Sequence, residues 1–183
     1  MQTIKCNSCG ASVQNIQNCE FCGSLFVRYN NLGLSLTNVL SDKGELTGFV
    51  FPGLENELKK NLSMQTDTNF IVTDIEFLNI NYAQIVASNM VIDLLQTSNI
   101  TVPSISIHLP FTEDREAEHY KFSCLKEKTL FKHSYNNEFS CHDYIMEFGK
   151  DALGAAYLVS KLLIEVEGLN RSTSLIYKTS DYS

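Results

Sequence analysis

Four cysteines near the start of the chain are the residues whose types and spacing best suit a defined chemistry. Cys6 and Cys9 belong to one Cys-x-x-Cys-Gly unit, and Cys19 and Cys22 belong to a second. Two intervening residues allow one tight turn to aim both sulfurs at a single point, and four thiolates match a tetrahedral zinc ion. We therefore predict one Zn²⁺ per chain, held by Cys6, Cys9, Cys19 and Cys22. Iron also fits four thiolates, but zinc needs no redox role.

The glycine after each second cysteine supports the same interpretation. Gly10 and Gly23 can take a positive φ, which lets backbone N–H groups turn back toward the sulfurs. Four cysteines close the coordination sphere and leave no position for water, so the predicted metal is structural and not catalytic.

The two cysteine pairs and their glycines also resemble a known small module. Residues 4–24 resemble a short zinc ribbon of the rubredoxin-like type found at the N-terminus of many bacterial proteins. The resemblance implies a ribbon fold and a metal-binding role, and it implies no activity. A module of this size needs a staple because its core is small. We predict a zinc ribbon over residues 1–30 and a second domain over residues 31–183.

Charge and composition restrict the possible partners and the location of the chain. The formal net charge is −7, and the acidic excess lies outside residues 1–30, which contain only Lys5, Glu20 and Arg28 as charged side chains. No basic patch is present, which disfavours nucleic acids and anionic membranes. No apolar run is long enough to span a bilayer, and no signal peptide is visible, so we expect a cytoplasmic protein. Paired cysteines in a reducing compartment indicate metal binding and not disulfides.

Residues 31–183 show the alternating and helical patterns of an α+β domain. Alternating apolar residues predict strands, and leucines four apart predict a short helix through Leu54, Leu58 and Leu62. The composition of residues 81–96 predicts a second helix, and Pro110 is expected to end a strand. The strands are predicted over residues 32–37, 46–51, 69–78, 104–109, 120–122, 130–135 and 174–178.

A long helix near the C-terminus is the strongest helical pattern. Ser140 and Asp143 form a candidate capping box, an apolar stripe runs from Ile145 to Val166, and Gly168 is a natural stop. We expect an antiparallel sheet with this helix packed on it. A face offered to a partner subunit is the alternative.

The remaining histidines and cysteines give weaker signals. Cys141 would lie at the helix start, where acidic neighbours oppose a thiolate, so an inert thiol is expected. His108 lies on the polar face of a strand, which favours a hydrogen-bonded histidine over a catalytic base. His119 closes an acidic stretch, residues 113–118, that is interpreted as a solvated loop. A second metal site is conceivable but lacks a familiar ligand spacing; its members would be Cys124, His133, Cys141 and His142.

No phosphate-binding loop, nucleophile elbow or zinc-protease motif is present in the sequence. The leading hypothesis is a non-enzymatic, zinc-binding cytoplasmic protein whose ribbon is a structural or docking module. Its α+β domain would then bind another protein, as an adaptor or chaperone does. An enzyme with a pocket in residues 50–183 is the first alternative, and a pocket that holds Cys141, His133 or His108 within hydrogen-bond reach of each other would favour it. Nucleic-acid binding through the ribbon is the second alternative.

Overall fold

A computed structural model describes residues 4–5, 11–13, 50–66, 69, 71–77, 80–88, 103–170 and 172–182. The four predicted zinc ligands and the boundary between residues 30 and 31 lie outside this set. The predicted strands over residues 32–37 and 46–51 also lie outside it, except for Val50 and Phe51, which belong to no strand. Near the N-terminus, β1 (Ile4–Lys5) pairs antiparallel with β2 (Ser12–Val13).

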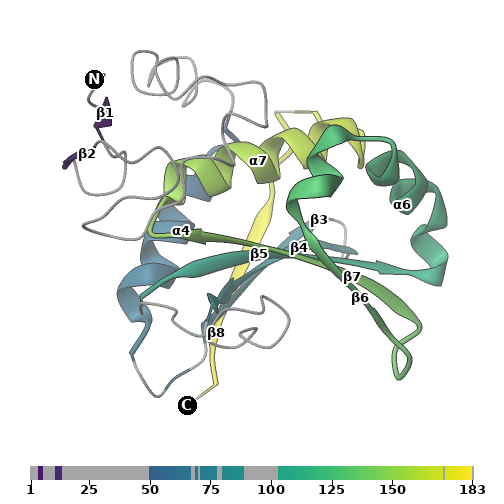
Figure 1. The fold of residues 1–183 in the computed structure, drawn as a ribbon, viewed down its shortest axis with the longest axis horizontal. Helices are drawn as coiled ribbons and strands as arrows, with labels where there is room; N and C mark the ends of the chain where they lie inside the picture. Colours follow the sequence, from purple (N-terminus) through teal and green to yellow (C-terminus); the bar gives the residue numbers. More distant parts are fainter. Residues whose placement is uncertain are drawn as a thin grey trace.

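A six-stranded antiparallel sheet forms the centre of the fold (Figure 1), and the predicted α+β class is confirmed. The strand order is β6-β7-β5-β4-β3-β8. The order differs from the sequence because β8, at the C-terminus, pairs with β3 at the far side of the sheet. The strands are β3 (Ile71–Phe77), β4 (Ile80–Ala87), β5 (Ile105–Thr112), β6 (Lys132–Asn136), β7 (Cys141–Gly149) and β8 (Ile176–Asp181).

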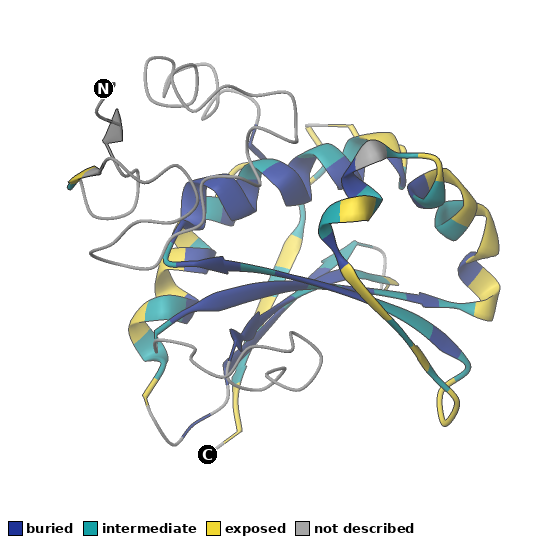
Figure 2. Ribbon diagram, in the orientation of Figure 1, coloured by how far each residue is buried: buried dark blue, intermediate teal, exposed yellow. Residues whose placement is uncertain are grey.

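Helices cover one face of this sheet, and their inward sides are buried (Figure 2). They are α4 (Leu54–Met64), α6 (Glu116–Ser123) and α7 (Ala152–Glu165), with short 3₁₀ turns at η2 (Glu113–Arg115) and η3 (Lys126–Leu130). The pleat of β5 explains the core, because Ile107, Leu109 and Phe111 point toward the helices while His108 points to the opposite face. Among the helices that the structure describes, none has the length and apolar character needed to cross a membrane.

The predicted helix over residues 81–96 is wrong for its first part, which is strand β4. Composition favoured a helix, but β4 gains backbone hydrogen bonds from β3 on one side and from β5 on the other. Side chains alternate accordingly: Ile85 enters the core while Gln84 faces the other way. Tertiary pairing here outweighs local propensity.

Two further predictions are wrong in the region that follows β5. Tyr120 and Phe122 belong to α6 and not to a strand; Phe122 packs in the core while Tyr120 is exposed. The C-terminal helix begins at Ala152, because residues 141–149 form β7. Its cap is Asp151, whose side chain accepts a hydrogen bond from the Gly154 N–H at 2.9 Å. The predicted stop is confirmed at Gly168, with φ +71°.

Pro110 does not end β5, because the strand continues to Thr112. Pairing between β5 and β4 stops at His108, so the missing N–H of Pro110 falls where β4 is no longer a partner. Pairing with β7 continues on the other side through Pro110. The sheet is therefore split between β4 and β5 beyond His108.

The side chain of Arg115 bridges this split. Its Nη1 donates to the carbonyl oxygen of Pro110 on β5 at 2.8 Å and to that of Asn81 on β4 at 3.3 Å. Its Nη2 forms an ion pair with Glu167, just beyond the end of α7. Burial raises the pKa of Glu167 to about 7, although the nearby Arg115 charge acts in the opposite direction. One buried guanidinium thus joins two strands to the end of a helix.

A buried amide fastens α4 to the sheet. Asn61 Nδ2 donates to Thr73 Oγ1 at 3.0 Å and to the Ile85 carbonyl oxygen at 3.3 Å, and Asn61 Oδ1 accepts from Gln65 Nε2 at 2.8 Å. Gln65 in turn accepts from the Ser104 N–H at 2.9 Å, just before β5. These bonds fix the axial position of α4 over β3 and β4 and beside the start of β5.

Replacing Asn61 by alanine should lower the free energy of unfolding by about 2–3 kcal/mol, because buried partners lose their hydrogen bonds. Asn56→Ala makes the same chemical change at an exposed position of the same helix and should cost less than about 0.5 kcal/mol. Urea denaturation of both variants gives the comparison. Equal losses in the two variants would contradict this role for Asn61.

Candidate functional site

A cavity of about 420 Å³ lies where β5 ends and α6 folds back beside the β6–β7 hairpin. The chain forms it because β5 leads directly through η2 into α6, while β6 pairs only with β7 among the described strands. Its walls therefore come from segments that are distant in sequence. The lining residues are Phe111, Thr112, Glu113, Glu116, His119, Tyr135, Ser140 and His142.

Stacked rings form one wall of this cavity. The ring of His119 on α6 stacks on His142 of β7 at a centroid distance of 4.3 Å and on Phe111 of β5 at 5.3 Å. Tyr135 on β6 meets His142 edge-on at 4.9 Å. These contacts hold the imidazole of His119 against the sheet.

Two hydrogen bonds orient the imidazoles of this wall. His119 Nε2 lies 2.9 Å from the hydroxyl of the buried Tyr144, and His133 Nε2 lies 3.0 Å from His142 Nδ1. His133 also stacks on the Tyr144 ring at 4.5 Å. We refer to His119, His133 and His142 as the histidine cluster.

The surroundings keep two of these imidazoles uncharged at neutral pH. Burial, followed by the neighbouring His142 and His133, lowers the pKa of His119, while Glu116 acts weakly in the opposite direction. Burial and His142 likewise lower the pKa of His133. Negative charge at the cavity comes from Glu113 and Glu116, both of which are exposed.

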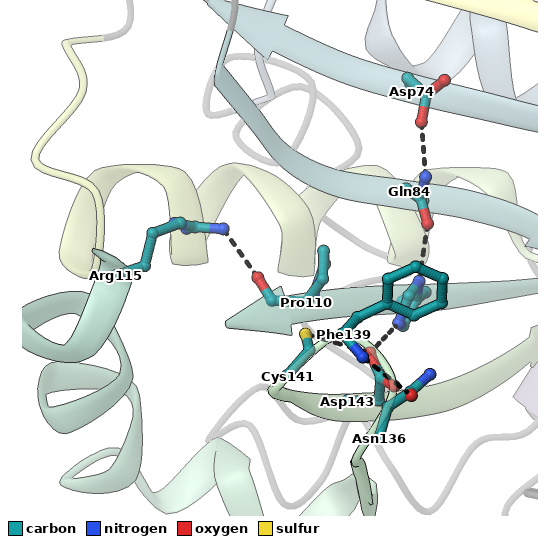
Figure 3. Close-up of polar contacts among 9 residues, drawn as sticks. Asp74, Gln84, Pro110, Arg115, Asn136, Phe139, Cys141 and Asp143 are labelled. Carbon is teal, nitrogen blue, oxygen red and sulfur yellow. Dashed lines mark hydrogen bonds and ion pairs between the residues drawn. The ribbon is translucent and has the colours of Figure 1, made fainter. Parts of the chain in front are cut away.

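The opposite face of the sheet carries a line of polar side chains that crosses four strands (Figure 3). Gln84 Nε2 donates to Asp74 Oδ1 at 2.7 Å, and Gln84 Oε1 lies 2.7 Å from His108 Nδ1. His108 Nε2 lies 2.7 Å from Asp143 Oδ1. The predicted hydrogen-bonded role of His108 is confirmed.

This line of bonds fixes the orientation of the His108 imidazole. The amide of Gln84 must turn its nitrogen toward Asp74, so its oxygen faces Nδ1, and a carboxylate oxygen faces Nε2. Both ring nitrogens of His108 are therefore held by hydrogen bonds, one to an amide oxygen and the other to a carboxylate oxygen. Burial acts to raise the pKa of Asp143, but the bond and charge of His108 hold it below its ordinary value.

Cys141 joins the end of this line without becoming a nucleophile. Its Sγ lies 3.5 Å from Asp143 Oδ1, so the carboxylate stands between the thiol and His108. Burial and the Asp143 charge raise the pKa of Cys141 to about 11. The thiol is therefore protonated at neutral pH, as the sequence predicted, although it lies on a strand and not at a helix start.

The four residues considered for a second metal site do not come together. His133 and His142 are hydrogen-bonded, but Cys141 precedes His142 on β7 and faces the other side of the sheet. Cys124 is exposed after α6. Among the residues that the structure describes, no group of three or more histidine, cysteine, aspartate or glutamate side chains is arranged to hold a metal ion.

The histidine cluster was missed by sequence reasoning. His119 was assigned to a solvated loop, and residues 141–149 were assigned to a helix, which hid the alternation of His142 and Tyr144. An informative signal was present, because His133 and Tyr135 alternate in the same way and their strands pair His133 with Tyr144 and Tyr135 with His142. Comparison with known proteins adds no assignment: no family model, curated protein or solved structure matches the chain.

Replacing His119 by phenylalanine should reduce the loss of stability on acidification. The native pKa of His119 lies below the unfolded value of 6.5, so the unfolded chain binds this proton first as the pH falls. The contribution of His119 to the free energy of unfolding is therefore fully present above pH 6.5. It is lost as the pH falls below that value. Urea denaturation at about pH 7.5 and about pH 5.5 should show a smaller difference for the variant than for the original chain.

Glu167 is present in both proteins, so its own titration cancels in this comparison. An unchanged pH difference in His119→Phe would contradict the proposed environment of the imidazole.

Proposed function

We propose that this chain is a non-enzymatic, zinc-binding protein of the cytoplasm that recognises another protein. Residues 1–30 act as a zinc ribbon with a structural or docking role, and residues 31–183 act as an interaction domain of the adaptor or chaperone type. The observation that carries the proposal is the exposure of three aromatic side chains on two of the elements that border the cavity.

These aromatic side chains lie on α6 and on the β6–β7 hairpin. Tyr120 on α6 is 72% exposed, Tyr135 on β6 is 47% exposed, and Phe139 in the hairpin turn is 66% exposed. Aromatic residues are enriched in protein interfaces because they bury a large area at small entropic cost. A partner that covered these rings would remove their apolar surface from water, which favours binding. We call Tyr120, Tyr135 and Phe139 the aromatic rim.

The chemistry of the nearby groups supports recognition over reaction. Cys141 is a thiol with its pKa raised to about 11, and His108 is paired on both ring nitrogens. In the histidine cluster, His119 is bonded to the hydroxyl of Tyr144, and His133 is bonded to His142. A nucleophile and a base within reach of each other, which would favour the enzyme hypothesis, do not arise from these contacts.

The pairing of β1 with β2 supports the ribbon. Ile4 pairs with Val13 and Lys5 with Ser12, and in the sequence Cys6 and Cys9 fall between these two strands. A hairpin connection is a suitable position for a pair of ligands separated by two residues. The second pair, Cys19 and Cys22, would complete the tetrahedron.

Purified protein should contain about one zinc ion per chain, and Cys19→Ser should lose most of it, because three thiolates hold the ion less tightly. Elemental analysis after exhaustive dialysis measures the content. Cys124→Ser is the matched control, since Cys124 is exposed and should not contribute. Full zinc occupancy in Cys19→Ser would mean that other ligands bind the metal.

The aromatic rim can be tested by affinity capture from an extract of cells that express the chain. A Tyr120→Ala/Phe139→Ala variant should recover a specific partner at least about tenfold less well, because interface aromatics contribute strongly to binding. Tyr182→Ala is the control: it removes an aromatic ring of similar exposure just beyond β8, away from the cavity. Equal recovery by all three proteins would exclude the aromatic rim as the contact surface.

A further inference from the structure

We propose that the cavity between α6 and the β6–β7 hairpin binds an organic cation, a guanidinium or primary ammonium group, between its carboxylates and the ring of Tyr135. The inference rests on the proposed function, because it names the chemistry that a partner protein would present at the aromatic rim. The expected group is the side chain of an arginine or lysine.

The size of the cavity suits a side chain and not a bare ion. Its volume is about 420 Å³, within the range of small-molecule sites. The described residues offer no group of three ligating side chains to a metal, here or elsewhere. A bulky cation can instead use several separate contacts along the walls.

The charge of the lining favours a cation over an anion. Glu113 and Glu116 are its acidic members, and neither forms an ion pair with another residue that the structure describes. The lining contains no lysine or arginine. Nearby Arg115 is turned away and occupied by Glu167 and by two backbone carbonyls. The net charge of −7 adds long-range attraction for a basic segment.

The walls add contacts that a guanidinium or ammonium group can use. Tyr135 is about half exposed, so part of its ring remains open to a cation. The hydroxyl groups of Thr112 and Ser140 lie in the same lining and can accept hydrogen bonds. Ser140 has φ +48°, a left-handed conformation unusual for serine, at the turn that leads into β7.

The histidine cluster makes this binding sensitive to pH. The groups that act on His119 are His142, His133 and Lys128, which oppose its protonation, and Glu116, which favours it. Those that act on His133 are His142 and Lys128, with Asp143 in the opposite direction. At neutral pH neither His119, which lines the cavity, nor His133, which is hydrogen-bonded to His142 of the lining, adds positive charge. Acidification that protonates them should repel the cation.

The test is calorimetric titration of the full-length protein with the peptide acetyl-Gly-Arg-Gly-amide. A matched peptide carries citrulline in place of arginine, which keeps the shape and removes the charge. Agmatine serves as a free guanidinium compound. The arginine peptide should bind with a dissociation constant on the order of 0.1–1 mM. Binding should weaken at about pH 5.5.

The variant Glu113→Gln/Glu116→Gln should weaken this binding about tenfold or more, since it removes both unpaired carboxylates. Glu138→Gln is the control, because it removes an exposed carboxylate from the nearby hairpin turn that does not line the cavity. All three carboxylates are exposed, so folding should be retained, and far-UV circular dichroism checks this. Tyr135→Leu should also weaken binding, by removing the aromatic face.

Each outcome decides the proposal. Selective binding of the arginine peptide that Glu113→Gln/Glu116→Gln abolishes would support it. Stronger binding of the peptide than of agmatine would assign the cation to a protein, and equal binding would assign it to a free amine or guanidine. Binding of the citrulline peptide with equal affinity, unaltered affinity in the double variant, or no detectable binding would overturn it.

Failure of the cavity and failure of the interaction surface give different results. If Tyr120→Ala/Phe139→Ala loses partner capture but the protein binds no peptide, the aromatic rim is supported as a contact surface and the cation site is excluded. If the protein binds the peptide but Tyr120→Ala/Phe139→Ala captures the partner as well as the original chain does, the cation site is supported and the aromatic rim is excluded as the contact surface.

Discussion

The guanidinium of Arg115 is the interaction on which the rest of the described fold depends. Backbone pairing between β4 and β5 stops at His108, and Pro110 offers no donor beyond that point. Arg115 replaces the missing ladder with side-chain donors to both strands. Its charge would be costly in this buried position without Glu167, which joins the end of α7 to the same point. Because Arg115 ends η2, the bridge also fixes where α6 begins, and α6 forms one wall of the cavity.

Much of the fold was accessible from local sequence patterns, and two of the exceptions share one cause. Leucines spaced four residues apart predicted α4, and alternating apolar residues predicted β3 and most of β5. Gly168 predicted the end of the last helix. The segments that were wrongly assigned, β4 and β7, contain runs of apolar residues that suit either a helix or a strand. Their conformation is decided by hydrogen bonds from strands on both sides, which no local window contains.

The candidate site was harder to predict, because its members meet only through tertiary structure. His133 and His142 come from the paired strands of one hairpin, whereas His119 comes from α6, and the packing of α6 on the sheet brings it to them. The metal ligands of a zinc ribbon are recognisable because both members of a pair lie in one turn. Conversely, the polar line through Asp74, Gln84, His108 and Asp143 draws one residue from each of four strands. Only the register of the sheet brings such residues together.

Pro110 also has a consequence for how the chain reaches its native state. Antiparallel strands can slip by two residues and keep every side chain on its proper face, so hydrophobic pattern alone tolerates that error. A proline changes this balance. A slipped arrangement that placed Pro110 opposite β4 would leave a carbonyl without a donor and bring the pyrrolidine ring against the neighbouring backbone. Pro110 thereby disfavours slipped alignments of β5 during folding. The polar side chains that cross the sheet meet only in the correct alignment.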